Sequence, residues 1–108
     1  YLNNASIRGD LMISSIAVQV LPMTANENDV IKIVDHVIAY IDASGVNYQV
    51  GAFESTLEGD YDQLMSLLAQ LPKVAAEITD IPVMVYSKIN MATTSDVLTI
   101  AKKTDKYK

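Results

Sequence analysis

Acidic residues gather in one short stretch of the chain, FESTLEGDYDQL, which spans residues 53–64. Within it Glu58 and Asp60 flank Gly59, and Asp62 follows. Carboxylates at this spacing can perform acid–base chemistry or hold a cation. A calcium-binding loop would also need a later glycine and a glutamate, which this stretch lacks. The pattern therefore favours a strand that ends near Glu58, a turn at Gly59 and a helix capped by Asp60, which leaves Glu58 as the candidate for recognition.

Other chemistry-bearing residues have no partner at a useful spacing. The chain has no cysteine, which excludes disulfides, thiolate catalysis and cysteine-bound zinc. Its single histidine, His36, lies in a helical pattern with no acidic or hydroxyl partner at a set spacing, so we expect it on the surface. We therefore expect no enzyme, no catalytic residue, no bound metal and no cofactor.

Composition indicates one folded domain, for which a cationic or neutral ligand fits better than a nucleic acid. Of the 108 residues, 50% are hydrophobic and 19% are charged. The formal net charge of −5 argues against nucleic acid as a partner, since nucleic-acid binding depends on clustered Lys and Arg. No apolar run reaches the roughly 20 residues that span a bilayer, and no secretory signal is visible, so we expect no membrane contact and a cytoplasmic location.

Hydropathy patterns predict the elements that position the candidate residues. Alternation over residues 13–21 predicts a strand, and apolar spacing over residues 30–41 predicts a helix, with Asn26 or Asn28 as its N-cap and a stop at residues 44–45. Residues 47–53 and 55–59 are too close in sequence for anything but a hairpin that turns near residues 53–54.

The second half of the chain repeats this scheme. A helix begins after Asp60, and Pro72 predicts a kink or break before the helix resumes to Ile78. Residues 82–90 predict the last strand, after which Ser95 or Asp96 is expected to cap a short C-terminal helix.

This order predicts an α+β, ferredoxin-like βαββαβ fold, with a four-stranded antiparallel sheet and two helices on one face. Right-handed crossovers place the first strand between the third and the fourth. The other face of the sheet is left open. Alternation assigns to it Ser15, Ala17, Gln19, Gln49, Gly51, Phe53, Thr56, Glu58, Met84, Tyr86, Lys88 and Asn90.

The mixture of apolar and polar side chains on this open face predicts contact with a second copy of the chain, with a pocket between the copies. We expect a homo-oligomer, and a tetramer rather than a dimer.

Three segments resemble the small thiamine-binding protein family, which comprises single-domain relatives of YkoF. They are IAVQVLP (residues 16–22), FESTLEGDYDQL (residues 53–64) and KIN (residues 88–90) followed by a short helix that ends in KY. The resemblance covers residues 12–107 and implies a ferredoxin-like domain that assembles through its open sheet faces and binds thiamine or its hydroxymethylpyrimidine moiety at the interfaces. Residues 1–11 match nothing in the family and are expected to be a leader outside the single domain, residues 12–108.

An aminopyrimidine needs donors and acceptors at its edge and flat apolar contact on its faces. On this resemblance the expected ligand-binding residues are Ser15, Gln19, Phe53, Thr56, Glu58, Met84, Tyr86 and Lys88. The alternative is a structural or regulatory oligomerisation module that senses another small molecule, like the ACT domains that share this topology.

Overall fold

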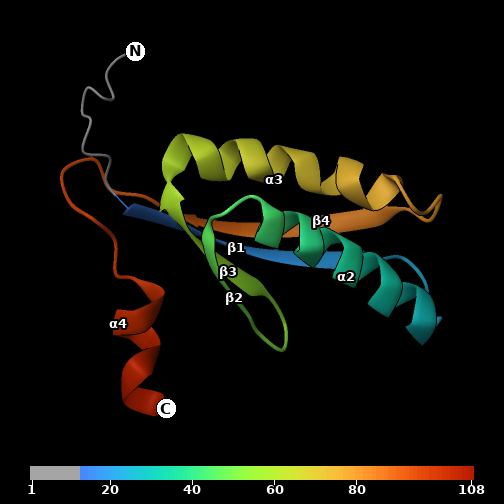
Figure 1. The fold of residues 1–108 in the computed structure, drawn as a ribbon, viewed down its shortest axis with the longest axis horizontal. Helices are drawn as coiled ribbons and strands as arrows, with labels where there is room; N and C mark the ends of the chain where they lie inside the picture. Colours follow the sequence, from blue (N-terminus) through green and yellow to red (C-terminus); the bar gives the residue numbers. More distant parts are fainter. Residues whose placement is uncertain (1–12) are drawn as a thin grey trace.

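The computed structural model describes residues 13–108, which form one four-stranded antiparallel sheet with two long helices over one face (Figure 1). The elements in chain order are β1 (Ile13–Pro22), α2 (Glu27–Ala43), β2 (Asn47–Val50), β3 (Ser55–Asp60), α3 (Tyr61–Ala76), β4 (Val83–Asn90), α4 (Ile100–Thr104) and the 3-10 turn η1 (Asp105–Tyr107). The strand order β2-β3-β1-β4 puts β1 between β3 and β4. The predicted ferredoxin-like fold is confirmed, whereas the proposed leader, residues 1–11, lies outside the described residues.

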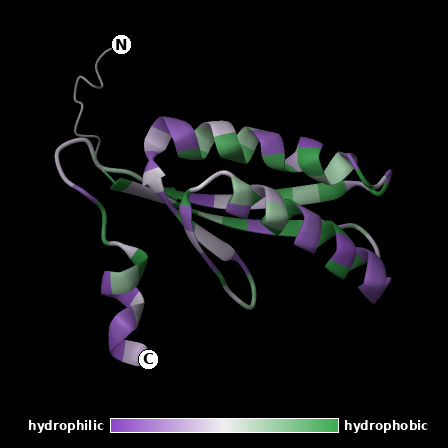
Figure 2. Ribbon diagram, in the orientation of Figure 1, coloured by the Kyte–Doolittle hydropathy of each residue, from purple (hydrophilic) through white to green (hydrophobic). Residues whose placement is uncertain are grey.

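The hydrophobic core lies between the sheet and the two long helices. Each helix presents an apolar stripe at helical spacing, and each central strand presents alternate residues, as the periods of 3.6 and 2 require. Hydrophobic positions alternate with hydrophilic ones along both helices in Figure 2. The residues with the lowest exposure in this core are Ile16, Ile33, Val37, Ile41, Leu57, Leu64, Leu71 and Ala75.

Both expected caps at the starts of the long helices are present. The Asn26 side chain accepts a hydrogen bond from the Asp29 N–H at 3.0 Å. The Asp60 side chain accepts one from the Gln63 N–H at 3.1 Å. Each cap satisfies a backbone donor that the first helical turn leaves without a partner. The acidic stretch around Gly59 is therefore, as predicted, the junction between β3 and α3.

A kink or a break was predicted at Pro72, and the break is wrong, because α3 is one continuous helix from Tyr61 to Ala76. It also ends before Ile78. A proline inside a helix removes one backbone hydrogen bond. The packing of α3 offsets this loss, since Leu71 and Val74 are buried on either side of the exposed proline.

The C-terminal helix begins later than predicted, and neither Ser95 nor Asp96 caps it. Thr99 is the cap, accepting a hydrogen bond from the Lys102 N–H at 3.2 Å. Asp96 instead accepts a hydrogen bond from the Ile13 N–H at 2.7 Å, while the Val97 N–H donates to the Ile13 carbonyl at 3.0 Å. The segment before α4 is thus tied to the start of β1.

His36 has an acidic partner that local spacing could not show. Its Nε2 lies 3.0 Å from the Glu77 carboxylate, which follows the end of α3. The pair links the two long helices on the side away from the sheet's open face. Because the pair bridges α2 and the end of α3, we assign it a structural role.

Candidate functional site

The register of the sheet fixes which strand residues share the open face. Ser15 lies opposite Glu58 on β3 and Asn90 on β4. Ala17 lies opposite Thr56 and Lys88 in the same way. Farther along β1, Gln19 faces Tyr86 and Leu21 faces Met84. The alternation predicted for these strand residues is confirmed, since directly paired residues project from the same face.

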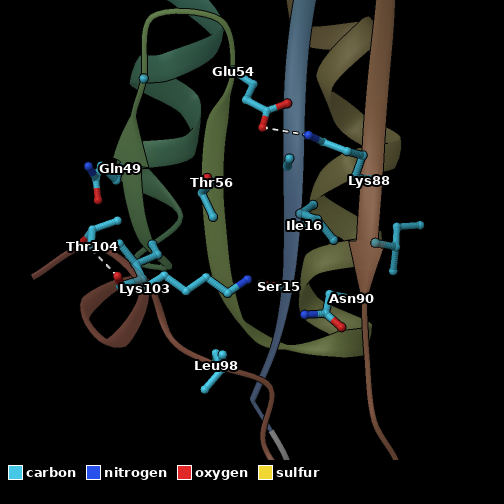
Figure 3. A pocket seen from close by; sticks show the side chains of 14 residues that line it. Ser15, Ile16, Gln49, Glu54, Thr56, Lys88, Asn90, Leu98, Lys103 and Thr104 are labelled. Atoms are coloured by element: carbon cyan, nitrogen blue, oxygen red, sulfur yellow. Dashed lines mark hydrogen bonds and ion pairs between the residues drawn. The ribbon is translucent and has the colours of Figure 1, made fainter. Parts of the chain in front are cut away.

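The C-terminal segment covers one end of this face and encloses a cavity of about 360 Å³ (Figure 3). This volume is within the range of small-molecule sites, about 300–1,000 Å³. The sheet contributes its floor and α4 contributes a wall. The lining residues include, from the sheet, Ser15, Ala17, Gln49, Thr56, Lys88 and Asn90, and from the C-terminal segment, Leu98, Ile100, Lys103 and Thr104.

Glu58 holds α4 against the sheet. One of its carboxylate oxygens accepts a hydrogen bond from the backbone N–H of Ile100 at 2.8 Å. The other accepts from the side-chain amide of Asn47 on β2. Both oxygens are therefore engaged at the border of the cavity, and this carboxylate, together with the contacts of Asp96 and Val97 with Ile13, positions the α4 wall.

A second charged contact closes the opposite end of the cavity. Lys88 Nζ lies 3.0 Å from a carboxylate oxygen of Glu54, as the dashed line in Figure 3 shows. The pair connects β4 to the turn between β2 and β3. Its exposure to solvent limits its contribution to stability, so we regard it mainly as a positional contact.

The residues predicted from the sequence fall into three places. Ser15, Thr56 and Lys88 line the cavity, and Glu58 borders it. Gln19, Met84 and Tyr86 share the same face but do not line this cavity. Phe53 stands apart, because it lies in the turn after β2 and is 85% exposed.

Phe53 borders a second cavity, of about 350 Å³, between the turn and α2. The alternation of faces stops where β2 ends at Val50, so period two does not set the direction of Phe53. Val50 is the last residue of β2. It lines this second cavity beside Ile31 and Val34 of α2, yet it stays half-exposed because the helix does not cover it.

The contribution of the C-terminal segment to the cavity was not predicted from the sequence. Leu98, Ile100, Lys103 and Thr104 line the cavity, and so does Glu54 in the turn. Only Leu98 and Ile100 carried a signal, since apolar side chains on either side of the cap residue Thr99 predict contact with the rest of the domain. No local pattern places Lys103 over the sheet.

Tyr48, on β2 at the edge of the sheet, has a pKa shifted from its ordinary value. Its hydroxyl donates a hydrogen bond to the Asp42 carboxylate at 2.9 Å. This bond, partial burial and the negative charge of Asp42 together raise the pKa of Tyr48 above its ordinary value of 10.0. The hydroxyl is therefore a stable donor at neutral pH.

Among residues 13–108, neither a metal-binding cluster nor a membrane-spanning helix is found. Over residues 13–108, no group of three or more His, Asp or Glu side chains is arranged to hold a metal ion. In the same range, no helix is both long and apolar enough to cross a membrane.

The fold and the site define a ferredoxin-like domain with a cavity of small-molecule size on its open face. Residues 16–108 match the family model described as thiamine-binding protein. Because the match covers most of the chain, the chain belongs to this family.

Individual relatives agree with this assignment. The chain is 32% identical over 63 residues to the UPF0045 protein CPE1503 of Clostridium perfringens, a match that spans 58% of this chain and 65% of that protein, less than two thirds of its length. A domain of unknown function, DUF77, from Bacillus cereus has a similar structure, with a TM-score of 0.78, 31% identity, and coverage of 90% of this chain and 91% of that one. Another similar structure, from Thermotoga maritima, is TM0486, provisionally described as a thiamine biosynthesis/salvage protein. At a TM-score of 0.77 and 21% identity, covering 89% of this chain and 99% of that one, it supports the fold alone.

Proposed function

We propose that this chain binds thiamine or its hydroxymethylpyrimidine moiety without transforming it, in the cavity between α4 and the open sheet face. Membership of the thiamine-binding protein family is the observation that carries this proposal. The description of TM0486 as a thiamine biosynthesis/salvage protein is consistent with it.

The lining of the cavity fits a flat aminopyrimidine. Hydroxyl groups of Ser15 and Thr56 and amides of Gln49 and Asn90 supply both donors and acceptors for the ring edge. Apolar contact for the ring face comes from Ala17 and from the nearby residues of the C-terminal segment, Leu98 and Ile100. Apolar walls with a few directed polar groups are typical of small-molecule sites.

The second part of the proposal is a homo-oligomer formed through the open face, a tetramer rather than a dimer. Beyond the cavity, Leu21, Met84 and Tyr86 are 40%, 42% and 49% exposed. They lie side by side across β1 and β4 because Leu21 is paired with Met84 and Tyr86 is next but one along β4. A patch of this kind favours burial against a second copy, which would close the open side of the cavity.

Two measurements test the ligand. Mass spectrometry under native conditions, on freshly purified protein, should detect a retained mass equal to thiamine or hydroxymethylpyrimidine. Calorimetric titration of the ligand-free chain should then give saturable binding of that compound, with no product on prolonged incubation. Absence of binding to both compounds would overturn the proposal in favour of an oligomerisation module for another effector, and turnover would overturn the non-enzymatic assignment.

A further inference from the structure

The charged groups that line the cavity do not cancel. They are Glu54, Lys88 and Lys103. Glu54 and Lys88 form an ion pair with each other. Within residues 13–108, the salt bridges are this pair, His36–Glu77 and Lys108–Asp105, so Lys103 has no carboxylate partner within 4.0 Å there. One positive charge is left over in the cavity of an otherwise acidic chain.

Lys103 reaches into the cavity from α4. In Figure 3 its side chain points from α4 across β3 in the direction of Ser15 on β1. Apart from the Glu54–Lys88 pair, the other polar groups of the lining are uncharged: the hydroxyl groups of Ser15, Thr56 and Thr104 and the amides of Gln49 and Asn90. An ammonium group beside neutral hydrogen-bond donors suits a phosphoryl group, which offers several acceptor oxygens and a negative charge.

Glu58 is the carboxylate that could otherwise neutralise Lys103, and its oxygens face elsewhere. They accept hydrogen bonds from Ile100 and Asn47, and Glu58 does not belong to the lining of the cavity. Its position fixes α4, and with α4 the base of the Lys103 side chain.

We infer that the cavity prefers a phosphate ester of a thiamine-class ligand to the free compound, with Lys103 as the group that binds the phosphoryl oxygens. This inference rests on the proposed function and specifies its ligand. Free thiamine brings a thiazolium cation, which the unpaired ammonium of Lys103 repels. A phosphate ester adds about −1.5 to −2 charge at neutral pH, which Lys103 attracts.

The test compares thiamine, thiamine monophosphate and inorganic phosphate by calorimetric titration of the full chain. The parent protein should bind the monophosphate about tenfold or more tightly than thiamine, and the ratio should fall as salt is added, because salt screens the charge interaction. Inorganic phosphate should compete with the monophosphate more than with thiamine.

Charge variants assign the effect to one residue. Lys103→Gln should bring the ratio to about one, because it weakens binding of the monophosphate and relieves the repulsion of thiamine, and Lys103→Arg should keep the preference. Lys106→Gln is the matched control: it removes the same charge from a nearby residue whose ammonium group lies 5.1 Å from the Tyr107 ring and outside the cavity lining. The control should behave as the parent.

The outcomes separate this inference from the proposed function. Equal affinities for thiamine and its monophosphate in the parent, or an equal loss of both in Lys103→Gln, would overturn the inference and leave thiamine binding intact. Failure of every thiamine-class compound to bind would overturn both. Retention of the preference by Lys103→Gln would also overturn the assignment to Lys103.

Discussion

The Glu58 carboxylate on β3 accepts a hydrogen bond from the backbone N–H of Ile100, 42 positions later in the chain. This contact joins the sheet to α4. Glu58→Ala should therefore increase the mobility of the α4 wall more than it lowers the stability of the whole domain. Hydrogen exchange at the Ile100 amide should accelerate about tenfold, equivalent to roughly 1.4 kcal/mol, within the range for a hydrogen bond to a charged group. Asp62→Asn is the control. It removes a carboxylate from an exposed position of α3 and should leave this exchange rate unchanged. Unaltered protection in Glu58→Ala would show that other contacts hold α4.

Thr56→Val tests the position of the ligand. The substitution keeps the size of the side chain but removes a hydroxyl from the floor of the cavity. Thiamine affinity should fall about tenfold, because a polar group of the ligand loses its partner. Gln19→Leu is the comparison, since Gln19 lies on the same sheet face outside this cavity. The thiamine affinity of Gln19→Leu should stay within about twofold of that of the parent. If Gln19→Leu lowered thiamine affinity more than Thr56→Val, the ligand would instead lie near Gln19 and its neighbour Tyr86.

Tyr86→Glu tests assembly through the open face. The parent should sediment as an oligomer at micromolar concentration, whereas Tyr86→Glu should dissociate, because an unpaired carboxylate would be buried between copies. Tyr86 is a better position than Ala17, which lies opposite Lys88 and would offer a new carboxylate a partner. Ser66→Glu adds the same charge to an exposed position of α3 and should not change the mass. A monomeric parent would contradict the assembly.

Pro72→Ala should stabilise the protein. A proline inside a helix costs about 3 kcal/mol relative to alanine, and its restriction of the unfolded chain returns only about 0.4–1 kcal/mol. Because α3 is continuous through Pro72, we expect the free energy of unfolding to rise by roughly 2 kcal/mol. Denaturant titration would measure the change. Gln70→Ala, at an exposed position of the same helix, should stay within about 0.5 kcal/mol. A lower free energy of unfolding in Pro72→Ala would mean that the proline stabilises the protein.

The Tyr48–Asp42 hydrogen bond should make stability depend on alkaline pH. Because the pKa of Tyr48 is raised in the folded state, its contribution is fully present below the ordinary value of 10.0 and is lost as pH rises through the higher folded value. The parent should therefore lose its stability advantage over Tyr48→Phe across that alkaline range. Ultraviolet absorbance of tyrosinate should show an earlier titration in Asp42→Asn. A pH-independent difference between parent and Tyr48→Phe would contradict this account.

Much of the fold could be predicted because short-range patterns encode it. Alternation in β1 and helical spacing in α2 follow from which side of each element faces the core. The break expected at Pro72 failed for the complementary reason: local chemistry disfavours helix there, but burial of Leu71 and Val74 outweighs it.

The sequence predicted the sheet side of the candidate site but not the wall formed by α4. Strand parity placed Ser15 and Thr56 on the open face, which the register confirms. The α4 wall was missed because distant contacts position it, namely Ile13 with Asp96 and Glu58 with Ile100. No period along the chain encodes contacts of that kind.

The hydrogen bonds that tie the C-terminal segment to the sheet have a consequence for how this domain can diversify. Since no residue of α4 is buried in the core, changes after Val97 can reshape one wall of the cavity while the sheet and both long helices keep their packing. Ligand preference and folding are thus encoded in largely separate parts of the chain. Exchanging this segment between relatives would be a direct way to transfer specificity without redesigning the scaffold.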